Sequence, residues 1–131
     1  MNDMPEKSTD SRLICADRVE GTTVYDRQGE KLGTVKDIFI DKVSGRVEYA
    51  SMAFGGMLGM GEKYHPVPWS ALDYDTHRDG FVVDLDKKFL EASPSYEGDG
   101  LAGPENEWGG EVSDYYSDRL PTGGYGASHT L

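Results

Sequence analysis

The apolar and polar residues in the middle of the chain form short runs separated by turn residues. Residues 32–41 are rich in β-branched and aromatic side chains, and residues 46–54 alternate between apolar and polar positions. The intervening Lys-Val-Ser-Gly at 42–45 is typical of a turn. The pattern therefore predicts an antiparallel hairpin. Its alternation weakens near Met52, where we expect a β-bulge or burial of both faces of the strand.

The same reasoning predicts four further short strands, at residues 22–25, 64–68, 72–74 and 81–85. One helical turn is expected at 69–72, and a short helix is expected over 86–93 with Asp86 as its N-cap. About six strands, 17 glycines and no long helix indicate an all-β fold, a small antiparallel β-barrel followed by this short helix. Closure of such a barrel removes exposed strand edges, and its own side chains fill the interior.

Charge divides the chain unevenly. The net charge is -11, of which residues 93–131 contribute -6 and residues 12–92 contribute -3. We therefore predict a flexible N-terminus at 1–11, a barrel domain over 12–92, and an extended acidic tail over 93–131, rich in Gly, Pro and aromatic residues, that is at most partly ordered. An acidic chain is repelled by phosphate backbones, so no direct nucleic-acid partner is expected. No signal peptide or membrane-spanning run is apparent, which predicts a cytoplasmic location.

Four stretches of sequence, in this order, resemble the PRC-barrel family: residues 24–41, 44–47, 54–63 and 66–72. The family is named for the cytoplasmic barrel of the photosynthetic reaction-centre H subunit, and the sequence resembles the stand-alone bacterial PRC-barrel proteins. The resemblance implies a small β-barrel that acts as an adaptor, on membrane complexes in photosynthesis and on a ribosomal protein in a ribosome-maturation factor. It implies no shared catalytic residues. The chain lacks the transmembrane helix of the H subunit and the second domain of the maturation factor, so neither specialised role is carried over.

Seven residues of these stretches are predicted to serve the structure: Asp26, Gly29, Gly33, Asp37, Gly45, Pro68 and Trp69. The glycines suit turns and a bend in the barrel. Asp37 is a carboxylate inside a predicted strand, which indicates either a structural bond to backbone or arginine or a functional contact. Two prolines at 66 and 68 suit a strand edge or the close of the barrel.

Candidate chemical sites are weak. The glycine-rich residues 55–61 are not followed by a helix, and Lys63 is not followed by Ser or Thr, so a phosphate-binding loop is not expected. The three histidines have no metal-ligand spacing, and Cys15 lies in an apolar stretch that predicts a buried, inert thiol. The aspartates near residues 73–86 predict a solvated face. We therefore expect no enzyme activity, no metal and no cofactor.

Two groups of residues are the candidate partner-binding sites. Met57, Leu58 and Met60 either fold over the barrel as a lid or form an adaptable contact surface. Aromatic residues are unusual in an acidic tail, so Trp108, Tyr115 and Tyr116 are hypothesised to be anchors in a groove of the same barrel or of a neighbouring subunit. Residues 111–119 are expected to form a short helix in either case.

The sequence thus predicts a non-enzymatic interaction module that self-associates, with a dimer favoured. It would dock on an unidentified protein in the cytoplasm or at the inner face of the membrane, peripheral to a membrane complex. Two alternatives stay open. One is a sensor that binds a small ligand or a divalent cation at the aspartate-rich hairpin and the glycine-rich loop. The other is an accessory factor in RNA processing or ribosome maturation.

Overall fold

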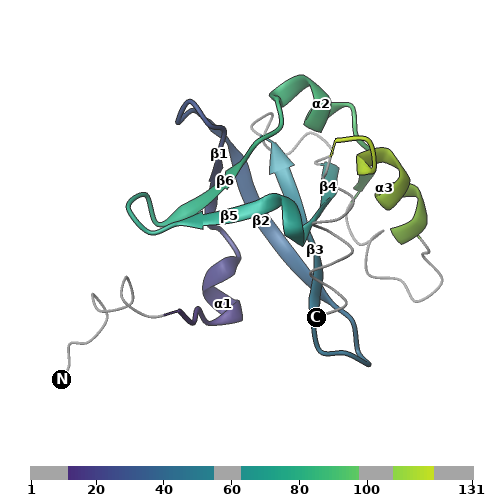
Figure 1. Cartoon of the computed structure of the whole chain (residues 1–131), viewed down its shortest axis with the longest axis horizontal. Helices are drawn as coiled ribbons and strands as arrows, with labels where there is room; N and C mark the ends of the chain where they lie inside the picture. The colour runs from purple at the N-terminus through teal and green to yellow at the C-terminus, as the bar shows by residue number, and fades with distance from the viewer. Residues whose placement is uncertain (1–11, 55–62, 98–107, 120–131) are drawn as a thin grey trace.

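The computed structural model describes residues 12–54, 63–97 and 108–119 (Figure 1). Seven strands form one sheet: β1 (Thr23–Tyr25), β2 (Lys31–Ile40), β3 (Val47–Phe54), β4 (Lys63–Pro68), β5 (Leu72–Asp75), β6 (Gly80–Val83) and β7 (Tyr96–Glu97). The helices are short: α1 (Ala16–Val19), the 3₁₀ turn η2 (Trp69–Ala71), α2 (Lys87–Glu91) and α3 (Gly109–Tyr116). The β-rich fold expected from the sequence is confirmed.

The central hairpin is β2 and β3, as the alternation of residues predicts. They pair antiparallel from Gly33 opposite Phe54 to Ile40 opposite Val47. The turn between them is fixed by Asp41, whose carboxylate accepts hydrogen bonds from the amides of Val43 (2.8 Å) and Ser44 (3.0 Å). These two amides hold the pKa of the Asp41 carboxyl below its ordinary value.

The irregularity expected near Met52 has both of the anticipated causes. Val35 lies opposite Met52 and Asp37 lies opposite Ser51, so Lys36 is an extra residue and the bulge is in β2 rather than in β3. Strand β3 is also buried on both faces here, because Ser51 is as fully buried as its neighbours on either side. The hydroxyl of Ser51 accepts a hydrogen bond from the amide of Asp37 at 3.1 Å.

The topology departs from the expected antiparallel, closed barrel in two respects. The strand order is β5-β6-β1-β2-β3-β4-β7, and the sheet described is not closed by pairing between its two outer strands. In addition, β1 and β6 pair parallel, with Val24 opposite Phe81. A parallel pairing joins residues far apart in the sequence, so alternation and turn signals could not reveal it.

The hydrophobic core contains side chains from β1, β2, β3, β4 and β6, with Leu90 of α2 and Val112 and Tyr116 of α3 added to it. Helix α2 begins as the sequence predicts, because the Asp86 carboxylate accepts a hydrogen bond from the Phe89 amide at 2.7 Å. Figure 1 shows α2 and α3 together at one side of the sheet, while α1 lies at the lower end.

Candidate interaction site

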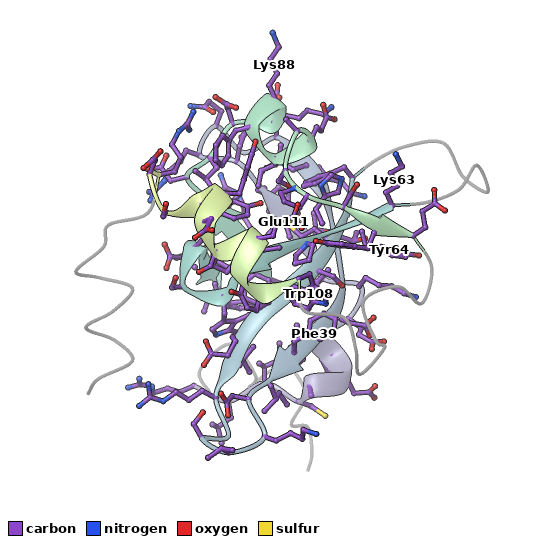
Figure 2. All side chains as sticks on the ribbon, turned by 90° about the vertical axis from the view of Figure 1, so that its right-hand side faces the viewer. Phe39, Lys63, Tyr64, Lys88, Trp108 and Glu111 are labelled. Carbon is purple, nitrogen blue, oxygen red and sulfur yellow. The ribbon has the colours of Figure 1, made fainter. Side chains whose placement is uncertain are left out.

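The part of the chain expected to be an irregular tail contributes two elements to the folded body. Strand β7 pairs with β4 through Lys63 and Tyr64, and α3 packs on the sheet. Helix α3 coincides with most of the short helix predicted for residues 111–119. Figure 2 shows α3 across the sheet, with Trp108 directly over Phe39.

The surface beneath α3 is aromatic. We call it the aromatic face, and it consists of Phe39 of β2, Tyr49 of β3, Phe89 of α2 and Tyr96 of β7. Trp108 packs edge-to-face on two of these rings, with centroid distances of 5.1 Å to Phe39 and 5.0 Å to Tyr49. The ring of Tyr96 lies 6.4 Å from that of Trp108. Aromatic pairs in this geometry contribute about 0.5–1.5 kcal/mol each beyond the area that they bury.

The other end of α3 is held by Phe89. The Tyr115 ring stacks on it at 4.7 Å, the Tyr116 ring meets it edge-on at 5.6 Å, and the Arg119 guanidinium lies 4.1 Å above it. The Tyr115 hydroxyl donates a hydrogen bond to the Phe89 carbonyl at 2.9 Å. Trp108 and Tyr115 therefore anchor the two ends of α3 on different parts of the aromatic face.

Two more tyrosines bond to α3 from the aromatic face. Tyr49 Oη donates to the carbonyl of Gly109 at 3.1 Å, and Tyr96 Oη donates to Glu111 Oε1 at 3.0 Å. Burial and this bond to the Glu111 carboxylate together raise the pKa of Tyr96 to about 12. Both of these tyrosine hydroxyls thus have their partners on α3.

Helix α3 has little intrinsic stability. It has eight residues, whereas isolated helices shorter than about 12–15 residues are marginal in water. Its first turn contains Gly109 and Gly110, and each glycine costs about 0.8–1.0 kcal/mol relative to alanine within a helix. The N-cap residue Trp108 makes no side-chain capping bond. The helix is therefore maintained by its contacts with the aromatic face and the core.

A buried polar cluster lies beside α3. His65 Nδ1 is 3.0 Å from Ser93 Oγ, and Ser93 Oγ donates to the carbonyl of Leu90 at 2.6 Å. Because that bond uses the only hydroxyl proton of Ser93, His65 must donate through Nδ1. Burial lowers the pKa of His65, against the weaker opposing effects of a hydrogen bond to the Ser93 backbone and of the Glu91 carboxylate. The histidine is therefore neutral at neutral pH.

Tyr116 reaches the same region from α3 and is fully buried. Within the described part of the chain its hydroxyl has no hydrogen-bond partner. Burial raises the pKa of Tyr116 to about 12. The Tyr116 hydroxyl is an exception to the rule that buried polar groups are paired.

The structure places the remaining predicted residues as follows. Met57, Leu58 and Met60 lie outside the described residues, so their predicted contact role stays a prediction. The Asp26 carboxylate accepts bonds from the amides of Gln28 and Glu30, both at 2.9 Å, and closes the turn that contains Gly29 (φ +90°). Trp69 packs edge-on against Phe81 at 5.5 Å.

Two predicted motif residues have a more specific position than the sequence suggested. A Cβ at Gly33 would lie 2.1 Å from the carbonyl oxygen of Ala53, so this glycine permits close approach of β2 and β3. Pro68 is buried and lies opposite Tyr49 of β3. It stands at the end of β4 that β7 does not reach, because β7 pairs only with Lys63 and Tyr64. Asp37 is half-buried, and the hydrogen bond that fixes it to β3 is made by its backbone.

One expectation about chemistry is wrong. Cys15 is exposed rather than buried, because the apolar residues beside it, Leu13 and Ile14, precede α1 and themselves face outward. Over residues 12–54, 63–97 and 108–119, no cluster of His, Cys, Asp or Glu could hold a metal ion. In the same ranges, no helix is long and apolar enough to cross a membrane.

The β5–β6 hairpin, the basis of the sensor alternative, carries an open cleft of about 380 Å³. Its aspartates are partly engaged. Asp75 Oδ2 lies 3.1 Å from Arg78 Nη1, and Asp75 Oδ1 accepts the amide of His77 at 2.8 Å. Asp79 accepts a hydrogen bond from the Tyr74 hydroxyl at 3.3 Å. A cation would therefore compete with existing bonds for these oxygens.

Sequence reasoning did not single out the aromatic face. Phe39 and Tyr49 lie opposite each other in the β2–β3 hairpin, and the sequence pattern was used only to predict that hairpin. The available signal was the number of apolar positions on both faces of these strands, which exceeds what one core requires.

Comparison with known proteins gives a family and little more. No curated protein matches the sequence. Among the solved structures that match, a putative 16S ribosomal RNA processing protein RimM from Pseudomonas aeruginosa aligns with a TM-score of 0.38 and 15% identity, covering 61% of this chain. The alignment spans about half (48%) of that protein's length. The model of the PRC-barrel domain matches residues 14–90, more than half of the sequence, and therefore the chain belongs to the PRC-barrel domain family.

Proposed function

We propose that this chain is a non-enzymatic interaction module of the cytoplasm, which binds an amphipathic helix of a protein partner on its aromatic face and associates with a second copy of itself. The observation that carries the helix-binding role is the occupation of that face by α3. A helix of eight residues with two glycines in its first turn is held in place by contacts rather than by its own stability.

The positions of these residues relative to the family match support a face on which α3 can be exchanged for another helix. Phe39, Tyr49 and Phe89 of the aromatic face lie within the part of the chain that matches the family, 14–90. Helix α3 lies outside that part. Three of the four residues of the face thus lie within the matched domain, whereas Tyr96 and the helix that covers the face belong to the segment that follows.

The anchors of α3 define what a partner must offer. Trp108, Val112 and Tyr115 are spaced four and three residues apart, so they project from one side of a helix. Docking of an apolar helix stripe on a hydrophobic surface through such spacing is a recurrent mode of peptide recognition. A partner helix with aromatic anchors at the same spacing would fit the aromatic face.

The test uses a fluorescent peptide with the sequence of residues 108–119 and two forms of the full chain. One form is the natural protein, and the other carries Trp108→Ala and Tyr115→Ala, which weaken its own α3. A tethered segment competes at an effective concentration on the order of millimolar. We therefore expect the peptide to bind the double variant at least 10-fold more tightly than the natural protein in fluorescence anisotropy.

A matched peptide with the same two alanines is the control and should bind neither form. Circular dichroism and a cooperative thermal transition establish that the double variant is folded. Equal, negligible binding of the natural-sequence peptide to both folded forms would contradict the proposal. Equal binding of both peptides to the double variant would also contradict it, because the anchors would then confer no recognition.

A further inference from the structure

In the part of the chain that the structure describes, most of the exposed large apolar side chains lie at one end of the molecule. Five large apolar side chains are exposed within the described ranges, and four of them belong to two segments at this end: Leu13 (84%), Ile14 (45%), Ile40 (53%) and Val43 (97%). Figures 1 and 2 both place α1 and the β2–β3 turn at the same lower end, away from α2. We call residues 12–20 and 40–48 the hairpin end.

The exposed side chain at the tip of the turn is presented by a fixed backbone. The Asp41 carboxylate accepts the amides of Val43 and Ser44, and the amide of Gly45 donates to the Asp41 carbonyl at 2.8 Å. Gly45 takes a φ of +81°, which completes the turn. Ordering of this segment on binding therefore costs little, which favours its use as a contact.

The charges of the hairpin end identify its occupant. Residues 12–20 contain two basic and two acidic side chains, and so do residues 40–48. Both segments thus have zero net charge in a chain of net charge -11. An anionic membrane would favour a positive surface, and a basic partner would favour a negative one.

In a two-fold symmetric dimer the same patch faces itself. A patch of either sign would repel its own copy, whereas a patch of zero net charge would not. From the apolar side chains and this local neutrality we infer that the hairpin end is the surface through which two copies of this chain associate. The inference rests on the self-association included in the proposed function and names the surface that performs it.

The size of the hairpin end determines how tightly we expect the two copies to bind. The hairpin end has 18 residues, compared with about 20–30 residues per partner in a standard interface. We therefore expect a reversible dimer with a dissociation constant on the order of micromolar. Because the rest of each copy is acidic, screening by salt should strengthen the dimer.

Sedimentation velocity on the full chain between about 1 and 500 µM tests this, in reducing buffer so that a Cys15 disulfide cannot imitate a dimer. We expect a concentration-dependent dimer that is tighter in 0.5 M than in 0.05 M NaCl. The double variant Ile14→Asp, Val43→Asp should weaken dimerisation at least 10-fold. Tyr74→Asp, at the fifth exposed apolar side chain, is the matched control and should leave it unchanged.

A natural protein that stays monomeric throughout, or a dimer that the double variant leaves intact, would overturn the inference. Co-sedimentation of the monomeric natural protein with vesicles of phosphatidylglycerol and phosphatidylcholine, lost in the double variant, would instead assign the hairpin end to a membrane and also overturn it. Neither substitution touches the aromatic face. The peptide experiment can therefore fail or succeed independently of this one.

Discussion

Replacing Gly33 by alanine tests the close approach of β2 and β3, on which both Phe39 and Tyr49 of the aromatic face depend. The added Cβ would lie 2.1 Å from the carbonyl oxygen of Ala53 and 3.1 Å from the Cα of Phe54. Both neighbours are backbone atoms of a strand that is paired on its two sides. Rotation of a side chain cannot relieve the contact, so the two strands must separate.

The cost follows from the displacement required. Cβ contacts below 3.0 Å are essentially absent from proteins, so the strands must move apart by about 1 Å. Hydrogen bonds in the ladder then exceed the usual limit of about 3.2 Å. Loss of two buried backbone bonds costs about 1–3 kcal/mol each, and we expect Gly33→Ala to lower the free energy of unfolding by about 2–6 kcal/mol. That is a large part of the roughly 5–15 kcal/mol that stabilises a typical domain.

Gly45→Ala is the matched control. Gly45 has a φ of +81° and nothing within 4 Å of its added Cβ, so only backbone strain of about 1–2 kcal/mol is expected. Urea unfolding followed by circular dichroism measures both variants, with the slope of the transition checked for each. If Gly33→Ala costs no more than Gly45→Ala, the register and close spacing of β2 and β3 described above are incorrect.

Three further changes have expected outcomes of known sign. Tyr115→Phe removes a hydrogen-bonded hydroxyl and should lower the free energy of unfolding by about 1 kcal/mol. Tyr116→Phe removes a hydroxyl that has no partner among the described residues and should leave the free energy of unfolding unchanged or raise it. Urea titrations of both variants would contradict this if Tyr116→Phe were the more destabilising of the two. The pKa of His65 is lowered in the folded protein, so as pH falls this histidine is protonated in the unfolded chain before it is protonated in the folded one. The stabilisation that neutral His65 contributes is therefore complete above the ordinary pKa of 6.5 and is lost as pH decreases through the folded pKa. Urea midpoints between pH 8 and 5 should fall less steeply for His65→Asn than for the exposed control His77→Asn. Asp86→Ala removes the N-cap of α2 and should lower the free energy of unfolding by about 1 kcal/mol, which thermal denaturation measures, whereas an unchanged midpoint would contradict the capping role.

Local rules predicted the local structure. The β2–β3 hairpin, the Asp86 cap and the helical turn after Pro68 follow from alternation, capping and proline placement within a few residues. Each depends on neighbours in the sequence. The exposure of Cys15 was missed for the same reason, since an apolar run is normally buried and only tertiary placement shows that this one lies outside the core.

Features made by distant residues were beyond such rules. The pairing of β1 with β6 and the docking of α3 on Phe39 and Phe89 join separate parts of the chain. The prediction that Trp108, Tyr115 and Tyr116 are anchors rested on their presence in an acidic segment. Which surface they contact is decided by shape complementarity with the aromatic face, which composition does not encode.

The parallel pairing of β1 with β6 has a consequence for the order of folding. Val24 and Phe81 are neighbours in the sheet but 57 positions apart in the sequence, whereas the β2–β3 and β5–β6 hairpins close over short loops. The entropy lost on closing the longer loop is repaid only when the two hairpins meet, so we expect them to form before β1 and β6 join. Until then, the edge of β6 that will receive β1 carries unpaired backbone groups. The edge of β1 that pairs with β6 is likewise uncovered until residue 83, the last residue of β6, has been synthesised. The protein is therefore most exposed to aggregation in the period before β1 and β6 pair.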